Sequence, residues 1–324
     1  MLKKGLKIGA GVVAVLILLL VVFVTVTSWY VSRDKTEVFQ RLAGEFDRAE
    51  VLENETGVKS HIEFLELYNQ EGAALVTAYK RVPRELADDY FVLITYAGRR
   101  TGREVLNLIP ERDDVVLVSM QYPYYAPDTA RDMLFFINDV RLAGFKTVAG
   151  GKLMVDYLEH QGYNSENITV VGASLGAFFA TIHGALDERV PRVLAVHGGG
   201  DFRTIWRHIL NQREEWLPDR FITWFIDTFA GTFDPIHYVD RIAPREFIML
   251  ATRNDHYFPD KSFKKLYKNA NEPKHISWSD HGHVRTSRDE IVEAIVEEIK
   301  EYLEARRAAD FPDIAPRPAQ SDEE

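Results

Sequence analysis

The sequence NITVVGASLGAFFA, residues 167–180, decides how the rest of this chain is arranged. Its first part, Ile168 to Val171, is a β-branched apolar run that is typical of a buried strand. The pentapeptide Gly172-Ala173-Ser174-Leu175-Gly176 follows, and the residues after it predict a helix. A serine between two glycines at such a junction lies on a tight turn from strand to helix, which exposes its hydroxyl group.

The presence of glycine at positions 172 and 176 has a steric reason. The residues two before and two after Ser174 pass so close to neighbouring backbone that a Cβ atom would clash. The turn also aims the N–H of Leu175, at the start of the helix, toward the place where negative charge develops. We therefore interpret Ser174 as a nucleophile and Leu175 as one donor of an oxyanion hole. The pattern also occurs by chance in glycine-containing loops, and a serine alone is inert, so the chain must supply a base and an acid.

Composition bounds the class of protein. A chain of 324 residues, 46% hydrophobic and 27% charged, is long enough for one large α/β domain or two small ones. Its net charge of −10 argues against a nucleic-acid partner, because no basic cluster after residue 34 offsets it. Since the chain has no cysteine, disulfides, cysteine metal ligands and a cysteine nucleophile are excluded.

The N-terminus predicts a membrane segment. Three lysines within the first seven residues precede an uncharged apolar run from Ile8 to about Val31, which is long enough to cross about 30 Å of hydrocarbon. Trp29 and Tyr30 lie at its far end, where aromatic residues favour the interface. A cleavable signal peptide is the alternative, but its apolar core is normally about 7–15 residues long. We favour an uncleaved, single-pass signal anchor with the N-terminus in the cytoplasm and the rest of the chain outside: in the periplasm or cell exterior in a bacterium, or in the lumen or exterior in a eukaryote.

After the anchor, residues 1–34, the sequence predicts a stalk helix over residues 35–59. Residues 60–68 and 74–80 predict two strands of a hairpin. Apolar runs typical of strands then alternate with helical patterns: strands at 90–96, 115–120, 168–171, 193–196, 247–251 and 275–278, and helices at 143–161, 203–233, 261–269 and 287–307. This alternation predicts a mainly parallel sheet with helices on both faces, which binds ligands at the carboxyl ends of its strands. The tail, residues 309–324, is rich in Pro, Ala and acid and is predicted to be disordered.

Two aspartates compete for the role of the acid. Asp255 lies in the loop after the strand 247–251, where its carboxylate can accept the Nδ1–H of an imidazole. An Asn-Asp turn that bonds only local backbone is the alternative interpretation of this loop. Asp201, which follows the strand 193–196, is the second candidate. We favour Asp255.

The base is expected in the segment Ser279-Asp280-His281-Gly282-His283-Val284, ahead of the last helix. One of its two histidines would take the proton of Ser174 and pass it to the leaving group. We favour His283, which follows a glycine, over His281. His281 and His283, together with Asp280 and His256, could also form a metal site. An H-x-H pattern alone is a weak signal, and no zincin pattern occurs. We therefore expect no metal and no cofactor.

The second oxyanion donor is expected in the loop after the strand 90–96. Gly98 and Arg99 lie there, and the backbone N–H of Arg99 is the better candidate. Arg99 and Arg100 are alternatively a simple turn or a site for an acidic substrate group. Further candidates for the substrate pocket are Gly98, Tyr122, Trp206 and Trp224.

Together these motifs resemble an α/β-hydrolase, close to the esterase, dienelactone-hydrolase-like and prolyl-oligopeptidase-like branches. The resemblance covers about residues 60–308 and rests on Gly172–Gly176, on Asp255 followed by Phe258-Pro259, and on Gly282-His283. Ala97 is a departure, because many members have His-Gly before the oxyanion donor. The donor is a backbone N–H, so the hole can survive this change.

The resemblance also implies a cap over the active site, since the segment 203–233 stands where the family often carries one. Its Trp and Phe content suggests an apolar lid or acyl pocket, and packing onto the core is the alternative. A cap beside an apolar N-terminal helix also suggests the hypothesis that the protein acts on lipids at the bilayer.

The resulting expectation is a membrane-anchored serine hydrolase, specifically a carboxylesterase of small-molecule ester or acyl substrates, tethered through residues 8–31. In this interpretation Ser174 attacks the carbonyl, His283 is base and then acid, and Asp255 orients His283. Two alternatives stay open. One is a serine peptidase of the prolyl-oligopeptidase-like type, although the chain has no segment of propeller size. The other is a catalytically inactive hydrolase fold that acts as a membrane-tethered binding protein.

Overall fold

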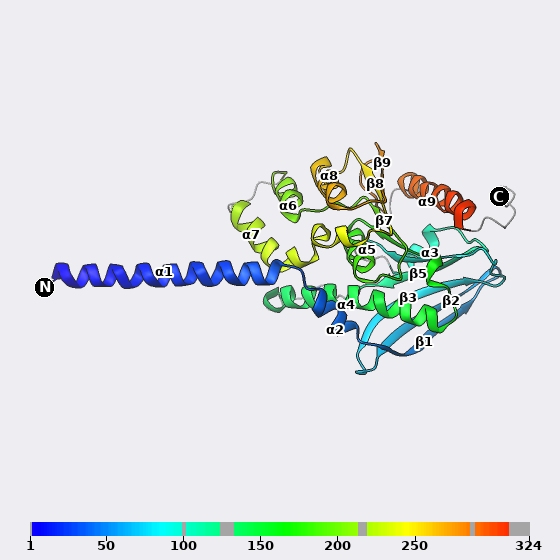
Figure 1. The fold of residues 1–324 in the computed structure, drawn as a ribbon, viewed down its shortest axis with the longest axis horizontal. Coiled ribbons are helices and arrows are strands. Elements are labelled where there is room, and N and C mark those ends of the chain that lie inside the picture. The colour runs from blue at the N-terminus through cyan, green and yellow to red at the C-terminus, as the bar shows by residue number, and fades with distance from the viewer. Residues whose placement is uncertain (1, 99–101, 124–132, 213–218, 286–288, 311–324) are drawn as a thin grey trace.

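The computed structural model describes residues 2–98, 102–123, 133–212, 219–285 and 289–310 (Figure 1). Within them, nine strands form one sheet in the order β1-β2-β3-β5-β4-β6-β7-β8-β9. The strands are β1 (Phe46–Thr56), β2 (Ser60–Asn69), β3 (Ala74–Pro83), β4 (Phe91–Tyr96), β5 (Val115–Gln121), β6 (Ile168–Ala173), β7 (Arg192–Val196), β8 (Glu246–Thr252) and β9 (Lys274–Ser279).

The sheet is mainly parallel, as the alternating pattern predicted. β4 through β9 pair in parallel, whereas β1, β2 and β3 pair antiparallel and join the rest through β5. The expected hairpin is confirmed as β2 and β3. The chain passes from β4 to β5 on one side and returns to β6 on the other side of β4. Ligands bind in such sheets where the strand order reverses, at the carboxyl ends of the strands, and Ser174 follows β6 at this point.

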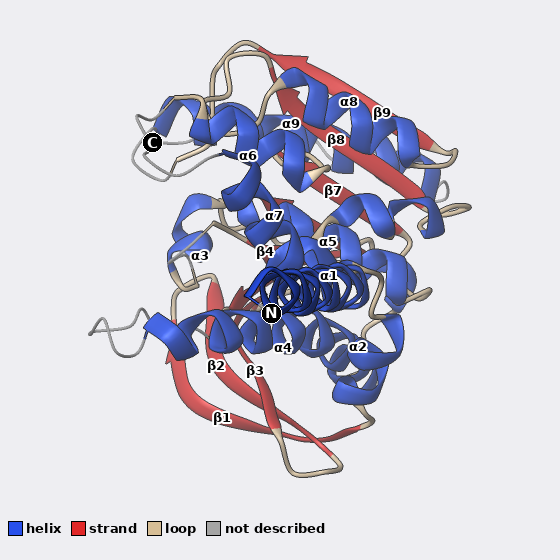
Figure 2. Ribbon diagram, turned by 90° about the vertical axis from the view of Figure 1, so that its left-hand side faces the viewer, coloured by secondary structure: helices blue, strands red, loops and turns tan. Residues whose placement is uncertain are grey.

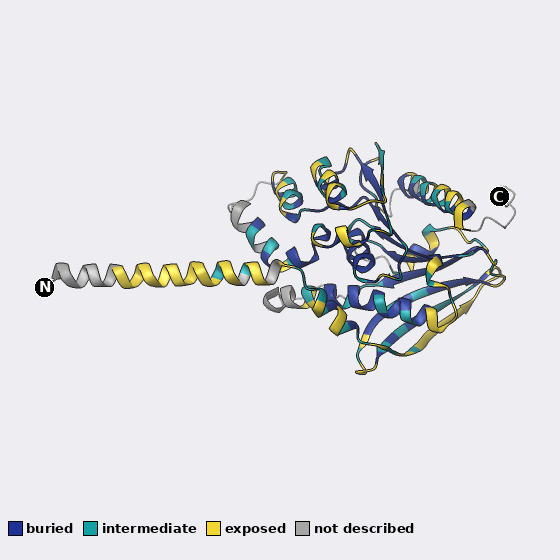
Figure 3. Ribbon diagram, viewed as in Figure 1, coloured by how far each residue is buried: buried dark blue, intermediate teal, exposed yellow. Residues whose placement is uncertain are grey.

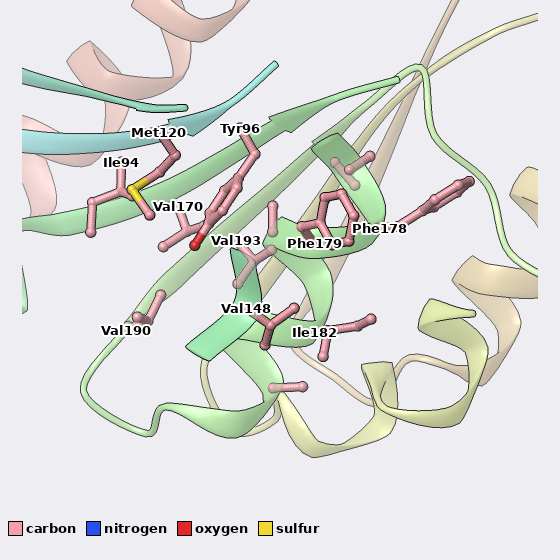
Figure 4. Close-up of a cluster of buried hydrophobic side chains, with 14 of the residues drawn as sticks. Ile94, Tyr96, Met120, Val148, Val170, Phe178, Phe179, Ile182, Val190 and Val193 are labelled. Atoms are coloured by element: carbon pink, nitrogen blue, oxygen red, sulfur yellow. The ribbon is translucent and has the colours of Figure 1, made fainter. Parts of the chain in front are cut away.

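Helices cover both faces of the sheet, which confirms the predicted layers. The helices are α1 (Leu2–Ser32), α2 (Thr36–Ala43), α3 (Glu104–Leu108), α4 (Met133–His160), α5 (Leu175–Leu186), α6 (Phe202–Leu210), α7 (Asp219–Ala230), α8 (Asp260–Asn269) and α9 (Asp289–Asp310). Side chains of α2, α4, α5 and α8 share one hydrophobic core, and those of α3 and α9 share the core on the opposite face. Figure 4 shows Ile94, Val170 and Val193 of three strands beside Phe179 and Ile182 of α5.

The stalk helix expected over residues 35–59 is wrong in its second half. α2 ends at Ala43, and the residues Phe46–Thr56 form the edge strand β1, which pairs with β2. Because β1 lies at the edge with most residues exposed, it carries charges and lacks the apolar alternation of a half-buried strand. The sheet therefore begins at residue 46, before the expected limit at residue 60. α3 was not expected, and residues 311–324 of the predicted tail lie outside the described residues.

α1 projects from the domain as a single long helix whose described side chains are mostly exposed (Figure 3). Its segment Gly11–Tyr30 is long and apolar enough to cross a membrane, and an N-terminal signal sequence would have the same character. Its last turn touches the domain, because the hydroxyls of Ser28 and Thr228 are 2.5 Å apart. Viewed end-on, α1 lies between α7 and α4 (Figure 2).

Candidate active site

Ser174 occupies the turn between β6 and α5. Its φ of 56° lies in the left-handed region, which residues other than glycine rarely adopt. Its N–H donates to the carbonyl oxygen of Val196 at 2.9 Å, which ties the turn to β7. A Cβ on Gly176 would lie 2.0 Å from the carbonyl oxygen of Tyr96, and one on Gly172 would lie 2.3 Å from that of Gly176. Both glycines therefore allow the close backbone approach that the sequence pattern implied.

A hydrogen-bonded chain links Ser174 to a histidine and an aspartate. The Oγ of Ser174 is 2.8 Å from Nε2 of His283, and Nδ1 of His283 is 2.6 Å from Oδ2 of Asp255. The other carboxylate oxygen of Asp255 accepts the N–H groups of Tyr257 and Phe258. An ionised Asp255 can only accept, so Nδ1 carries the proton and Nε2 is left to accept the proton of Ser174.

The competing candidates lie elsewhere. His281 and His256 are exposed, whereas His283 is buried with 8% of its surface accessible. The Asp201 carboxylate pairs with the Nζ of Lys265 and accepts from the Thr204 hydroxyl. Of the candidates His256, His281, His283 and Asp201, the geometry thus brings only His283 to Ser174.

His197 is a member of this neighbourhood that the sequence reasoning missed. It follows β7, it is buried, and its Nδ1 accepts the N–H of Val284 at 2.9 Å. Burial is the main cause that lowers the pKa of His197 to about 4; Asp255 opposes it with a smaller effect, and His283 and His281 lower the pKa by still smaller ones. His197 is therefore neutral above that pH, and its neutral ring keeps the acceptor that holds Val284. A signal was present in the run His197-Gly198-Gly199-Gly200 at a strand end.

His197, Asp255 and His283 also lie close enough to share a metal ion, because one ligand atom from each lies within 4.8 Å of the others. Both ring nitrogens of His283 already have partners in Ser174 and Asp255. A metal ion would therefore have to replace one of these hydrogen bonds.

The expected oxyanion hole is described in part. Leu175 begins α5, so its N–H belongs to a helix N-terminus, and Leu175 lines the same cavity as Ser174 and Gly98. Arg99, the expected second donor, lies outside the described residues. Tyr122 does not line the cavity in the described part of the chain; its hydroxyl instead donates to the carbonyl oxygen of Ala97 and so braces the loop after β4.

A cavity of about 930 Å³ opens beside Ser174 and His283 at the carboxyl edge of the sheet. Its walls are predominantly apolar on both sides of that edge. Trp206 is one of the lining residues, whereas Trp224, a described residue of α7, is not one of them. On the α6 and α7 side the wall includes Ile205, Trp206, Ile209, Phe229 and Ala230; on the α3 and α9 side it includes Val105, Leu108, Ile109, Val292, Ile295 and Ile299. Such a cavity suits an apolar ligand that extends on both sides of Ser174.

No family model matches the chain, and no curated protein matches its sequence. Solved structures do match. Acetyl xylan esterase 1 from Thermoanaerobacterium sp. JW/SL YS485 is 16% identical with a TM-score of 0.58 over 82% of this chain and 95% of its own. The acetyl xylan esterase from Paenibacillus sp. R4 is 17% identical with a TM-score of 0.59 over 83% and 92%.

A third similar structure is the alpha/beta hydrolase GrgF from Penicillium sp. sh18, which is 14% identical with a TM-score of 0.50 over 76% of this chain and 99% of its own. At sequence identities this low, structural similarity shows a shared fold and does not show a shared activity. The mainly parallel sheet of this chain, with Ser174 on the turn after β6, and its similarity in fold to these structures lead to one conclusion: this chain has the α/β-hydrolase fold.

Proposed function

We propose that this protein is a serine carboxylesterase anchored to a membrane by α1. The observation that carries the proposal is the hydrogen-bonded chain from Ser174 through His283 to Asp255 at the wall of an apolar cavity. Such a chain supplies the general base that a serine needs to become nucleophilic. The names of the similar structures, two acetyl xylan esterases, support an ester as the substrate.

In the first half of the reaction, the Oγ of Ser174 attacks the ester carbonyl carbon while Nε2 of His283 takes the hydroxyl proton. The oxyanion is held by the Leu175 N–H and by a second N–H from the loop that carries Gly98 and Arg99. His283 then gives its proton to the leaving alcohol, and an acyl group remains on Ser174. In the second half, water adds to the acyl group by the same route and releases the acid, with Asp255 stabilising the imidazolium throughout.

The anchoring proposal rests on the apolar segment Gly11–Tyr30 and on the lysines before it. Basic residues favour the cytoplasmic side, so the N-terminus would lie in the cytoplasm and the hydrolase domain outside.

The test is labelling of the full-length protein in detergent with a fluorophosphonate, together with hydrolysis of p-nitrophenyl esters of graded acyl length. We expect Ser174→Ala to abolish labelling and to lower kcat by about ten thousand-fold or more, because removal of a nucleophile stops the shared proton transfer. Ser165→Ala is the matched control, because Ser165 lies at the opposite end of β6.

Two results would contradict the proposal. Cleavage of peptides with no cleavage of esters would indicate the peptidase alternative. A folded protein that neither labels nor hydrolyses any ester would indicate the inactive binding protein.

A further inference from the structure

The cavity beside Ser174 reaches the protein surface between α4 and α7. Val140 of α4 and Phe229 of α7 both line it, and they are 41% and 36% exposed. The guanidinium of Arg141 donates to the carbonyl oxygen of Phe229 at 2.9 Å, which joins the two helices at this rim. The apolar cavity thus meets solvent through apolar side chains between α4 and α7, and Tyr257, 37% exposed, is another exposed residue of its lining.

The same place is where α1 leaves the domain. Thr228, whose hydroxyl contacts Ser28 at the end of α1, is the residue before Phe229. The hydroxyl of Thr232 donates to the carbonyl oxygen of Arg33 at 3.0 Å. Figure 2 shows α1 end-on between α7 and α4, so a membrane crossed by α1 would lie against the rim of the cavity.

Cations gather at this rim although the chain as a whole carries a net charge of −10. Arg33 lies over the rings of Trp29 and Tyr30, at 4.8 and 5.3 Å, and the Nζ of Lys35 lies 3.7 Å from the ring centroid of Tyr30. Burial, first, and the charges of Arg33 and Arg141 lower the pKa of Lys35, against a smaller opposite effect of Asp34, so the three cations and this one carboxylate share a neighbourhood. Cations beside interfacial aromatic residues lie at the depth of lipid headgroups and attract anionic ones.

We propose that the substrate is a membrane lipid with a fatty acyl ester and an anionic phosphate headgroup, and that its acyl chain enters the cavity from the bilayer between α4 and α7. This inference rests on the esterase function and the anchoring proposed above. The acyl chain would move from one apolar medium to another, which avoids the cost of exposing its CH₂ groups to water. The headgroup would stay at the interface near Lys35 and Arg141, and the ester would reach Ser174.

The experiment uses the full-length protein reconstituted in phosphatidylcholine vesicles that contain phosphatidylglycerol with labelled, ester-linked acyl chains. Two rates are measured: release of labelled fatty acid, and turnover of p-nitrophenyl acetate added to the water. We expect release from lipid in the vesicles that hold the protein, and much slower release from the same lipid in separate, protein-free vesicles.

The outcomes separate the two proposals. Turnover of p-nitrophenyl acetate without fatty acid release overturns the lipid substrate and leaves the esterase standing, whereas loss of both activities overturns the esterase itself. Equal release from separate vesicles overturns entry from the bilayer, because the lipid would then reach Ser174 through water.

Matched variants locate the entrance. We expect Val140→Asp to lower the ratio of lipid to p-nitrophenyl acetate turnover about tenfold or more, since a carboxylate would lie in the path of the acyl chain. Val58→Asp is the control, because Val58 is 91% exposed at the turn between β1 and β2. An unchanged ratio in Val140→Asp overturns this entrance.

The headgroup is tested in the same way. We expect labelled phosphatidylglycerol to be hydrolysed faster than phosphatidylcholine with the same chains, and Lys35→Glu to remove this preference. Lys268→Glu, an exposed substitution on α8, is the control. Equal rates on both lipids in the unsubstituted protein overturn the anionic headgroup.

Discussion

His197 illustrates how a residue outside the proton-transfer chain can act on it. Its Nδ1 accepts the N–H of Val284, the neighbour of His283, and its ring centroid lies 6.1 Å from that of His283. A buried N–H without an acceptor costs roughly 1–3 kcal/mol, so the loop would shift to recover one. We therefore regard His197 as a positioning residue for the base.

The corresponding prediction compares two substitutions. We expect His197→Phe to lower kcat for a p-nitrophenyl ester about tenfold or more, because the N–H of Val284 loses its acceptor and His283 moves. His197→Asn keeps an acceptor near the place of Nδ1 and should restore most of the rate. Steady-state kinetics and fluorophosphonate labelling measure both variants. Equal rates in Phe and Asn variants would show that the hydrogen bond has no positioning role.

At the scale of elements, the junction of β6, α5 and β4 depends on a missing side chain. The start of α5 passes so close to the end of β4 that a Cβ on Gly176 would lie 2.0 Å from the carbonyl oxygen of Tyr96. A backbone oxygen cannot move aside without shifting β4 or α5. The packing that sets the elbow therefore also fixes the loop that carries Gly98.

We predict that Gly176→Ala lowers both thermal stability and fluorophosphonate labelling of Ser174, because the clash displaces the turn and the loop after β4 together. The stability loss is expected to reach about 1–3 kcal/mol, as for overpacked cores. Thermal unfolding and labelling rates check this. Gly102→Ala is the control, since its Cβ would come no closer than 3.4 Å, to the side chain of Gln121. Normal labelling in Gly176→Ala would contradict the steric argument.

For the whole molecule, two buried histidines link stability to pH. Burial is the main cause that lowers the pKa of His183 and of His197 to about 4, from an ordinary value of 6.5. As the pH falls from 6.5 to 4, both histidines bind a proton in the unfolded chain but stay neutral in the native fold. Each histidine then costs about 3 kcal/mol of stability. Burial raises the pKa of Asp234 to about 6, so protonation of Asp234 stabilises the native fold as the pH falls. This gain offsets the stability loss caused by about one of the two histidines.

We accordingly predict that the midpoint of thermal unfolding of the full chain in detergent is highest above pH 6.5 and falls toward pH 4. His183 lies beside Tyr96, with the Tyr96 hydroxyl 3.0 Å from its Nδ1. His183→Gln should unfold at a lower temperature at neutral pH, yet its midpoint should fall less steeply between pH 6.5 and 4. An equally steep fall in the variant would assign the pH dependence to other groups.

The sequence by itself determined the α/β class, the strand and helix order of the parallel part, and the loops that carry Ser174, Asp255 and His283. These features are local: a β-branched run, a Gly-x-Ser-x-Gly turn and a loop at a strand end each follow from a few neighbouring residues. The apolar segment Gly11–Tyr30 was equally readable, because its length and composition alone define it.

Only the tertiary structure decided what depends on distant partners. β1 is a strand because β2 supplies its backbone hydrogen bonds, and its own charged residues carry no such signal. His283 differs from His281 only by which one the fold turns toward Ser174, 109 residues away in the chain. The acceptor role of His197 and the contact between Ser28 and Thr228 at the cavity rim join segments far apart in sequence, so no local pattern records them.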